Sequence, residues 1–321
     1  MLRVENLQVT FKSKNSKVEA VRGVSFEISK GQTLAIVGES GCGKSVTCNA
    51  IMGLYSSRNT EISKKSLFFK SEDIATQIKS IRGQKISMIF QDPLTALNPT
   101  MSIGDQLVEG IKYHRNCTVR VALARARELL VLVGIENPDD RLKQYPHEFS
   151  GGMLQRIVIA MALMCEPELL IADEPTTALD VTIQLKILRL LKDLQNRLGM
   201  GLLVVTHDLG VVAAIADNML VMYAGQVVES GLVSDVLKNP EHPYTKALLE
   251  SMPSITTSID ELHAIDGQPP DLSNPPRGCA FFDRCRMAMK VCLSNEPPCF
   301  RLGNNLVKCW LKDERVRCNV V

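Results

Sequence analysis

Long apolar runs are absent from this 321-residue sequence. The longest apolar stretches, such as LLIA at 169–172 and MLVMYAG at 219–225, have the length of strands, whereas a membrane-spanning helix needs about 20 apolar residues. The first residues, MLRVENLQVTF, alternate apolar and polar side chains and lack the apolar core of a signal peptide. We therefore expect the chain to lie in the cytoplasm, or on the cytoplasmic face of a membrane, held there by a partner.

An excess of charge of one sign is also absent. The chain has 37 Lys and Arg against 35 Asp and Glu, a formal net charge of +2. No basic stripe and no sustained heptad pattern is visible, which argues against a nucleic-acid partner. No internal repeat is visible either, so we expect one copy of the catalytic core.

Cysteine is sparse over most of the chain and then accumulates. Six of the ten cysteines follow residue 278, and they are Cys279, Cys285, Cys292, Cys299, Cys309 and Cys318. In a reducing compartment such a cluster is more often a metal site than a disulfide framework. The other four cysteines are scattered, and we expect them to be small packed side chains.

Apolar strand-like runs alternate with helical patterns along the first 235 residues. This alternation is typical of a mostly parallel sheet covered by helices on both faces, an α/β fold. The first two strands alternate in polarity and suit an antiparallel edge. Residues 96–150 show no convincing strand and predict a helical insertion. The strand-like runs are 3–11, 24–28, 33–38, 86–91, 169–175, 202–208 and 218–231, and the helical patterns are 44–54, 119–133, 152–165, 181–198 and 209–216.

The stretch LAIVGESGCGKSVTCNAI combines a buried strand, a Gly-rich turn and a helix start. It matches the phosphate-loop pattern G-x-x-x-x-G-K-[ST], whose backbone N–H groups and helix N-terminus surround phosphate oxygens. Lys44 is expected to reach the β- and γ-phosphates of ATP, and Ser45 to hold Mg²⁺. The loop residues expected to bind the nucleotide are Gly38, Glu39, Ser40, Gly41, Cys42, Gly43, Lys44 and Ser45.

A second stretch, LLIADEPTTALD at 169–180, is a buried strand that ends in two adjacent carboxylates. Asp173 can bind Mg²⁺ through its water shell, and Glu174 would then polarise the attacking water. Carboxylates also mark strand ends for solubility alone. The phosphate loop upstream favours the catalytic interpretation.

Between these two stretches lies EFSGGMLQRIVIAMAL, in which Ser150, Gly151 and Gly152 precede a helix. Here the chain resembles the ATP-binding subunits of ABC transporters, whose signature is typically L-S-G-G-Q. The stretch in this chain departs from the signature at both ends, since it begins with Phe149 and ends with Met153.

The resemblance covers essentially the whole chain and assigns further roles. It implies that Gln91 is the Q-loop residue near Mg²⁺ and that His207 is the switch histidine. Asp180 is implied to be the D-loop residue, and Phe11 is a possible shelf for adenine. It also implies a head-to-tail dimer with a homologous or identical subunit, in which Ser150–Gly152 of one chain closes over the ATP of the other. ATP binding would then close the dimer.

The tail, with NPEHPYTKALLESMPS and GCAFFDRCRMAMKVC, resembles the C-terminal extension of ATPases from dipeptide, oligopeptide and nickel importers. In some members the tail cysteines bind a [4Fe–4S] cluster, and the matching positions here are Cys279, Cys285, Cys292 and Cys309. Cys299 and Cys318 are extras. By chemistry alone four thiolates also suit tetrahedral zinc, and the absence of any metal stays open. We expect a structural staple that is separate from the ATPase chemistry.

The resemblance predicts an ATPase that powers import of di- or oligopeptides through a membrane permease, served indirectly by an extracytoplasmic substrate-binding protein. Residues 91–112 are expected to contact the permease. Alternatives are a nickel or other metal-chelate importer and an ABC ATPase of DNA repair or translation without a membrane partner. The predicted parts are an ATPase core (1–95 and 155–235), a helical signature subdomain (96–154) and the importer-type extension (236–321).

Overall fold

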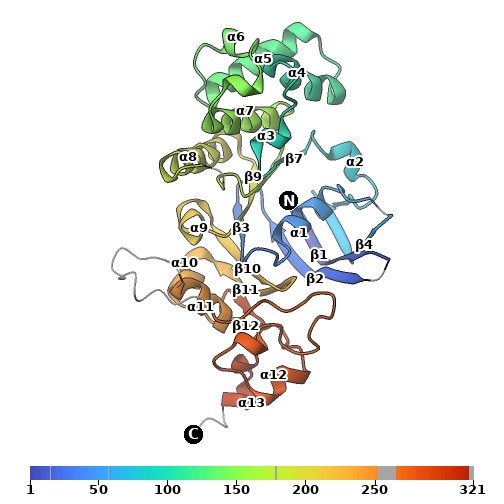
Figure 1. Ribbon diagram of the computed structural model, residues 1–321, viewed down its shortest axis with the longest axis vertical. Helices are drawn as coiled ribbons and strands as arrows, with labels where there is room; N and C mark the ends of the chain where they lie inside the picture. The colour runs from blue at the N-terminus through green and yellow to red at the C-terminus, as the bar shows by residue number, and fades with distance from the viewer. Residues whose placement is uncertain (15, 57, 178, 252–264, 318–321) are drawn as a thin grey trace. The chain divides into compact units, whose positions relative to one another are not determined.

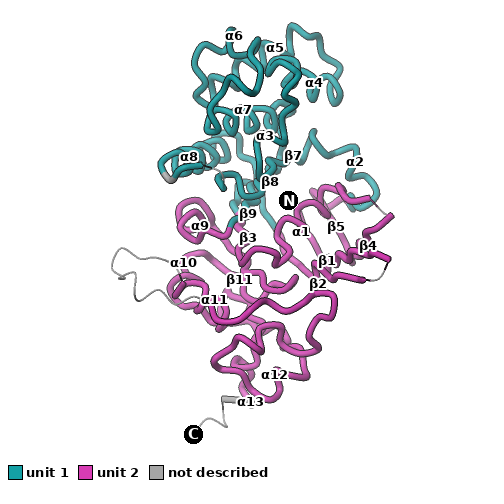
Figure 2. Tube along the Cα trace, in the orientation of Figure 1, with its two compact units in different colours: residues 1, 28–33, 73–206 teal, residues 2–27, 34–72, 207–321 magenta. Residues whose placement is uncertain are grey.

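The structure is a computed structural model that describes residues 1–14, 16–56, 58–177, 179–251 and 265–317. The chain divides into two compact units (Figure 2). Unit 1 contains residues 1, 28–33 and 73–206, and unit 2 contains residues 2–27, 34–72 and 207–321.

Three parallel strands form the centre of unit 1. Strand β8 (Leu169–Asp173) lies between β7 (Ile86–Ile89) and β9 (Gly201–Thr206), with Ile86 opposite Leu169 and Leu169 opposite Gly201. Every residue of these strands is buried, as their mostly apolar sequences predict. The helices of unit 1 are α2 (Ile78–Ile81), α3 (Pro93–Ala96), α4 (Ile103–His114), α5 (Val119–Leu132), α6 (Pro138–Arg141), η1 (Pro146–Glu148), α7 (Gly151–Leu163) and α8 (Val181–Leu198).

The helices α4, α5 and α7 pack on one another (Figure 1). Side chains placed before the first turn cap two of them: Ser102 accepts a hydrogen bond from the N–H of Asp105, and Thr118 accepts one from Val121. Residues 96–150, all of which the structure describes, contain helices and no strand. This confirms the predicted helical insertion.

Unit 2 contains an antiparallel sheet near the N-terminus. Strand β1 (Leu2–Lys12) lies between β2 (Lys17–Ile28) and β5 (Ser66–Phe69), and β6 (Glu72–Asp73) follows β5. Strand β4 (Thr60–Ser63) pairs with the later part of β1, with Phe11 opposite Thr60. The buried residues of β1 alternate with more exposed ones, in agreement with the predicted edge strands.

The second group of strands in unit 2 includes the strand that leads into helix α1 (Lys44–Ile51). Strand β3 (Thr33–Val37) runs parallel to β10 (Asn218–Tyr223), which forms an antiparallel hairpin with β11 (Gln226–Leu232). The remaining elements are α9 (Leu209–Ile215), α10 (Val233–Lys238), α11 (Pro243–Glu250), η3 (Phe282–Arg284), α12 (Lys290–Ser294), β12 (Phe300–Leu302), β13 (Asn305–Val307), η4 (Trp310–Lys312) and α13 (Glu314–Arg317).

The C-terminal extension shares its core with the strand that precedes the phosphate loop. Strand β13 pairs with β11 and so extends the sheet. Tyr244 and Leu248 of α11, together with Phe281, belong to the same buried cluster as Val37 of β3 and Val221 of β10. The tail is therefore packed against strands β3, β10 and β11 of unit 2.

The longer predicted strands and helices are all present. The short strands β4, β5, β12 and β13 were not predicted, because with three or four residues each they show too little periodicity to be recognised. Helix α4 lies within the predicted helical insertion, whereas helix α11 lies in the tail, where no helix was predicted.

Candidate active site

The predicted phosphate loop connects β3 to α1 with the expected strand–loop–helix geometry. Its glycines adopt positive φ angles, +152° at Gly38, +77° at Gly41 and +102° at Gly43. A Cβ atom at Gly38 would lie 2.2 Å from the carbonyl oxygen of Met222, and one at Gly43 would lie 2.5 Å from that of Ala20. Both positions therefore need glycine for close backbone approach as well as for conformation.

Lys44 lies at the start of α1 with its side chain buried. Its Nζ donates hydrogen bonds to the carbonyl oxygens of Gly38, at 2.8 Å, and Glu39, at 3.0 Å. The ammonium is thus held within the predicted phosphate loop. Next to it, burial raises the pKa of the Cys42 thiol, so this cysteine is a neutral packed side chain, as predicted for the scattered cysteines.

Glu39 is turned toward the C-terminal extension. Its backbone N–H donates to the hydroxyl of Tyr244, at 2.9 Å, and its carboxylate accepts two hydrogen bonds from the guanidinium of Arg284. These contacts were not foreseen. The partners lie more than 200 residues away along the chain, where no local pattern signals them.

In unit 1 the predicted catalytic residues Glu174 and Gln91 are brought together. Oε2 of Glu174 accepts hydrogen bonds from Nε2 of Gln91, at 3.1 Å, and from the hydroxyl of Thr177, at 2.8 Å. Glu174 has a φ of +46°, and its N–H donates to the carbonyl oxygen of Val205. A left-handed conformation at a residue other than glycine is costly and is often found at functional sites. The sequence analysis did not single out Thr177.

The other predicted residues of unit 1 lie at the ends of elements. Asp173 is the buried last residue of β8. Asp180 caps α8 by accepting a hydrogen bond from the N–H of Ile183, at 3.0 Å. Ser150 precedes the first residue of α7 but does not cap it through its side chain. A Cβ atom at Gly152 would lie 2.9 Å from Cγ2 of Ile183, so the α7–α8 contact requires a glycine there.

Two further predicted residues belong to unit 2. His207 is exposed and directly follows β9. Phe11 is half-buried at the end of β1, and its ring contacts that of Tyr55 edge-on at 5.2 Å. Tyr55 is a second aromatic side chain beside the possible adenine shelf, and the sequence analysis did not identify it.

The four cysteines proposed as cluster ligands, Cys279, Cys285, Cys292 and Cys309, line one small cavity. Its volume is about 10 Å³, and all four thiols are free. Burial raises the pKa of Cys279 to about 12 and that of Cys309 to about 11, and the neighbouring cysteines add to the shift at Cys279. The thiols of Cys279 and Cys309 are therefore protonated at neutral pH.

The cavity is lined by four cysteines, which is the number of thiolates that a [4Fe–4S] cluster or a tetrahedral zinc ion needs. Cys299 is exposed and does not line it. Within the described residues, however, no three or more His, Cys, Asp or Glu side chains are arranged to hold a metal ion. Cys318 lies outside the described residues. Folding thus brings the four predicted positions around one cavity of about 10 Å³.

The phosphate loop, the carboxylates at the end of β8 and the serine and glycines at the start of α7 define an ATP-binding cassette ATPase. The sequence profile described as "ABC transporter" matches residues 21–177, and the one described as "Oligopeptide/dipeptide transporter, C-terminal region" matches residues 228–292. The chain belongs to the ABC transporter family, in the branch that carries this C-terminal region.

Similar peptide transport proteins align with this chain over nearly its full length. The dipeptide transport ATP-binding protein DppD of Bacillus subtilis is 52% identical over 98% of this chain and 96% of its own length. The oligopeptide transport ATP-binding protein OppD of the same organism is 51% identical, covering 97% of this chain and 88% of its own length. A dimeric post-hydrolysis structure of the ATP-binding cassette MJ0796 with ADP and Pi is 28% identical, with a TM-score of 0.63, and matches 73% of this chain and 99% of its own.

Proposed function

We propose that this chain is the ATP-hydrolysing subunit that powers import of dipeptides or oligopeptides through a membrane permease. One observation carries the proposal: an ABC ATPase sequence and an oligopeptide/dipeptide transporter C-terminal region occur in one chain, aligned almost end to end with peptide transport ATPases. The two Bacillus subtilis proteins named above are peptide transport ATP-binding proteins by name, and no observation favours the nickel alternative.

The roles of the site residues follow from their positions. The loop 38–45 would bind the triphosphate, Lys44 would neutralise its charge, and Phe11 would support adenine. Ser45, Gln91 and Asp173 would hold Mg²⁺, which supplies charge neutralisation at the β- and γ-phosphates when bound. Glu174, oriented by Gln91 and Thr177, would accept a proton from the attacking water. His207 would sense the γ-phosphate.

The dimer explains why residues needed for one reaction lie so far apart in sequence. The cassette MJ0796 is described as dimeric in its ADP and Pi complex. In this chain Ser150, Gly151, Gly152 and Asp180 would complete the ATP site of a homologous or identical subunit. The hydroxyl of Ser150 does not cap its own helix, which is consistent with a role toward a partner's nucleotide.

The permease contact would place the chain as a peripheral protein on the cytoplasmic face of the inner membrane, with a substrate-binding protein acting indirectly on the other side. None of the described helices is long and apolar enough to cross a membrane. Within the predicted contact segment 91–112, Leu94 of α3 has 62% of its surface exposed whereas Leu97 has only 3%. Leu94 is thus the better candidate for contact with the permease.

Transport by the reconstituted complex tests the function. In proteoliposomes that contain the chain, its partner ATPase subunit, the permease and the binding protein, we expect MgATP to drive accumulation of a labelled dipeptide or oligopeptide. If the complex is a peptide importer, the same vesicles should not accumulate nickel. Nickel uptake without peptide uptake would overturn the assignment, and ATP hydrolysis that neither cargo stimulates would count against importer function.

We also propose that Cys279, Cys285, Cys292 and Cys309 ligate one [4Fe–4S] cluster. Their shared cavity supports this, although it would have to open and the thiols would have to lose their protons to accept the cluster. Bound metal would add folding energy to a Pro-rich segment. Zinc in a four-cysteine site is the alternative.

Metal analysis of protein purified without oxygen distinguishes these cases. We expect a brown protein with about four irons per chain. Serine at any one of the four positions should remove the colour, whereas the matched replacement Cys299→Ser, at an exposed thiol outside the cavity, should retain it. A colourless protein with one zinc per chain would show that the four cysteines bind zinc instead of a [4Fe–4S] cluster. A colourless protein without metal would refute a metal site.

A further inference from the structure

The C-terminal extension contacts the phosphate loop through Arg284, which binds the side chain of Glu39. This residue directly precedes Cys285 and has only 4% of its side chain exposed. Its Nη1 and Nη2 donate to the two carboxylate oxygens of Glu39, at 2.7 and 3.0 Å, which is the forked geometry of the strongest Arg–carboxylate pairs.

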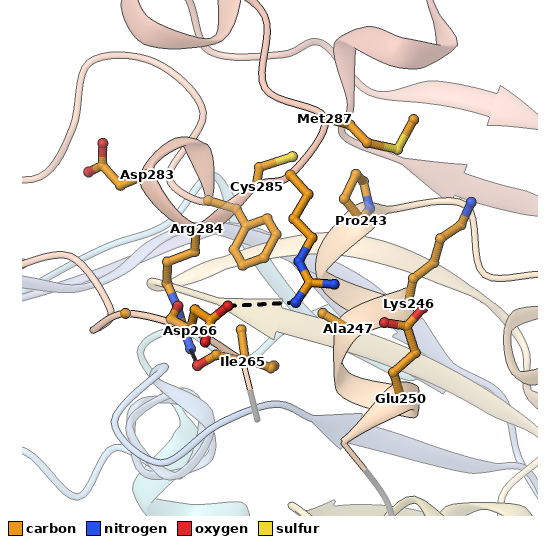
Figure 3. Close-up of a pocket in the computed structure, with 13 residues that line it drawn as sticks. Pro243, Lys246, Ala247, Glu250, Ile265, Asp266, Asp283, Arg284, Cys285 and Met287 are labelled. Atoms are coloured by element: carbon orange, nitrogen blue, oxygen red, sulfur yellow. Dashed lines mark hydrogen bonds and ion pairs between the residues drawn. The ribbon is translucent and has the colours of Figure 1, made fainter. Parts of the chain in front are cut away.

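The remaining donors of Arg284 are also used. Nε donates to the carbonyl oxygen of Asp266, at 2.9 Å, and Nη2 to that of Ile265, at 3.2 Å. Nη1 also donates to the hydroxyl of Tyr223, at 3.3 Å. A guanidinium has five N–H donors, and five hydrogen bonds are present. Figure 3 shows Arg284 extending from the segment before Cys285 toward Ile265 and Asp266.

Aromatic rings fix the position of this guanidinium. Arg284 lies over the rings of Tyr223 and Phe281, at 5.7 and 5.9 Å from their centroids. Tyr223, Tyr244 and Phe281 contact one another, with centroids 4.6 to 5.4 Å apart. The hydroxyl of Tyr244 accepts the N–H of Glu39, so both the side chain and the backbone of this loop residue are held by the same cluster.

We infer that Arg284 and Tyr244 are positioning residues for the phosphate loop, through which the C-terminal extension sets the affinity for ATP. The inference rests on the proposed assignment of residues 38–45 as the loop that binds phosphate. The loop needs its N–H groups aimed at one point, and Glu39 follows Gly38, where the chain turns from β3 into the loop. Contacts that fix Glu39 therefore reduce the conformational freedom that nucleotide binding would otherwise have to remove.

Such coupling is reciprocal. If contacts with the extension raise the affinity of the loop for ATP by some factor, then bound ATP must strengthen the contacts between loop and extension by the same factor. This distinguishes positioning from a purely structural contact, which would change stability without responding to nucleotide. It also revises the expectation that the extension is separate from the ATPase chemistry.

The test uses two small substitutions in the full complex with partner and permease. Arg284→Lys keeps the charge but loses the fork, and Tyr244→Phe removes only the hydroxyl. We expect the Kd and KM for ATP to rise between about 5- and 150-fold, the usual range of coupling between sites, with kcat at saturating ATP nearly unchanged. The matched controls are Arg286→Lys, at an arginine with 72% of its side chain exposed, and Tyr113→Phe, at an exposed tyrosine. Both should behave as wild type.

Amide hydrogen exchange supplies the second readout. In the wild-type complex, saturating ATP should slow exchange in the segment 279–287, and both Arg284→Lys and Tyr244→Phe should weaken this protection. A wild-type Kd in both variants, or lowered thermal stability with an unchanged Kd, would overturn the inference. Lys44→Ala distinguishes a failure of this inference from a failure of the proposed phosphate loop. If the Lys44→Ala protein also binds ATP normally, the assignment of the phosphate loop itself is wrong.

Discussion

Glu174→Gln should abolish most ATP turnover while ATP binding is retained. The amide has the shape of the carboxylate, and it can still accept hydrogen bonds from Gln91 and Thr177 through its oxygen, so the local structure should persist. It cannot accept a proton from the attacking water. Loss of a general base typically costs about 10²- to 10⁴-fold in rate.

The measurement is steady-state ATPase activity of the assembled complex, with the Kd for MgATP measured in parallel. The variant should accumulate as an ATP-bound closed dimer. The control Glu136→Gln, at an exposed acidic residue of the same unit, should hydrolyse ATP at the wild-type rate. Near-normal hydrolysis by Glu174→Gln would assign the proton acceptor elsewhere.

Lys44→Ala should instead remove ATP binding. The ammonium of Lys44 is buried in the loop and held by the carbonyl oxygens of Gly38 and Glu39, where it would meet the triphosphate. Hydrogen bonds to charged groups contribute about 1.5–3 kcal/mol, which corresponds to roughly 10- to 150-fold in Kd.

Calorimetric titration of the variant with MgATP measures this loss. Because alanine also removes the two bonds to the loop carbonyls, thermal unfolding should be recorded to show that the fold persists. Lys14→Ala, at an exposed lysine in the same unit, should bind as the wild type does. Tight binding by a folded Lys44→Ala protein would contradict the assignment of the phosphate loop.

These two variants separate binding from chemistry. If Glu174 activates water and Lys44 binds phosphate, then only Lys44→Ala should lose nucleotide, and only Glu174→Gln should trap it. The two residues belong to different compact units, Lys44 to unit 2 and Glu174 to unit 1. The two substitutions therefore alter different compact units of the chain.

The sequence alone was sufficient for the local parts of this protein. The run Leu169–Asp173 predicts a buried strand because every residue but the last is apolar. The glycines at 38 and 43 predict a phosphate loop because glycine lets the backbone curl so that successive N–H groups point inward. Phosphate binding depends on a few consecutive backbone N–H groups and a helix start, so it is encoded within about a dozen neighbouring residues.

Only the tertiary structure decided which distant residues meet. The pairs Gln91–Glu174, Tyr244–Glu39 and Arg284–Glu39 join positions separated by 83, 205 and 245 residues. No periodicity records such contacts, because they depend on how separate elements pack around a shared core. The same packing places the four cysteines around one cavity and brings their extension into contact with the phosphate loop.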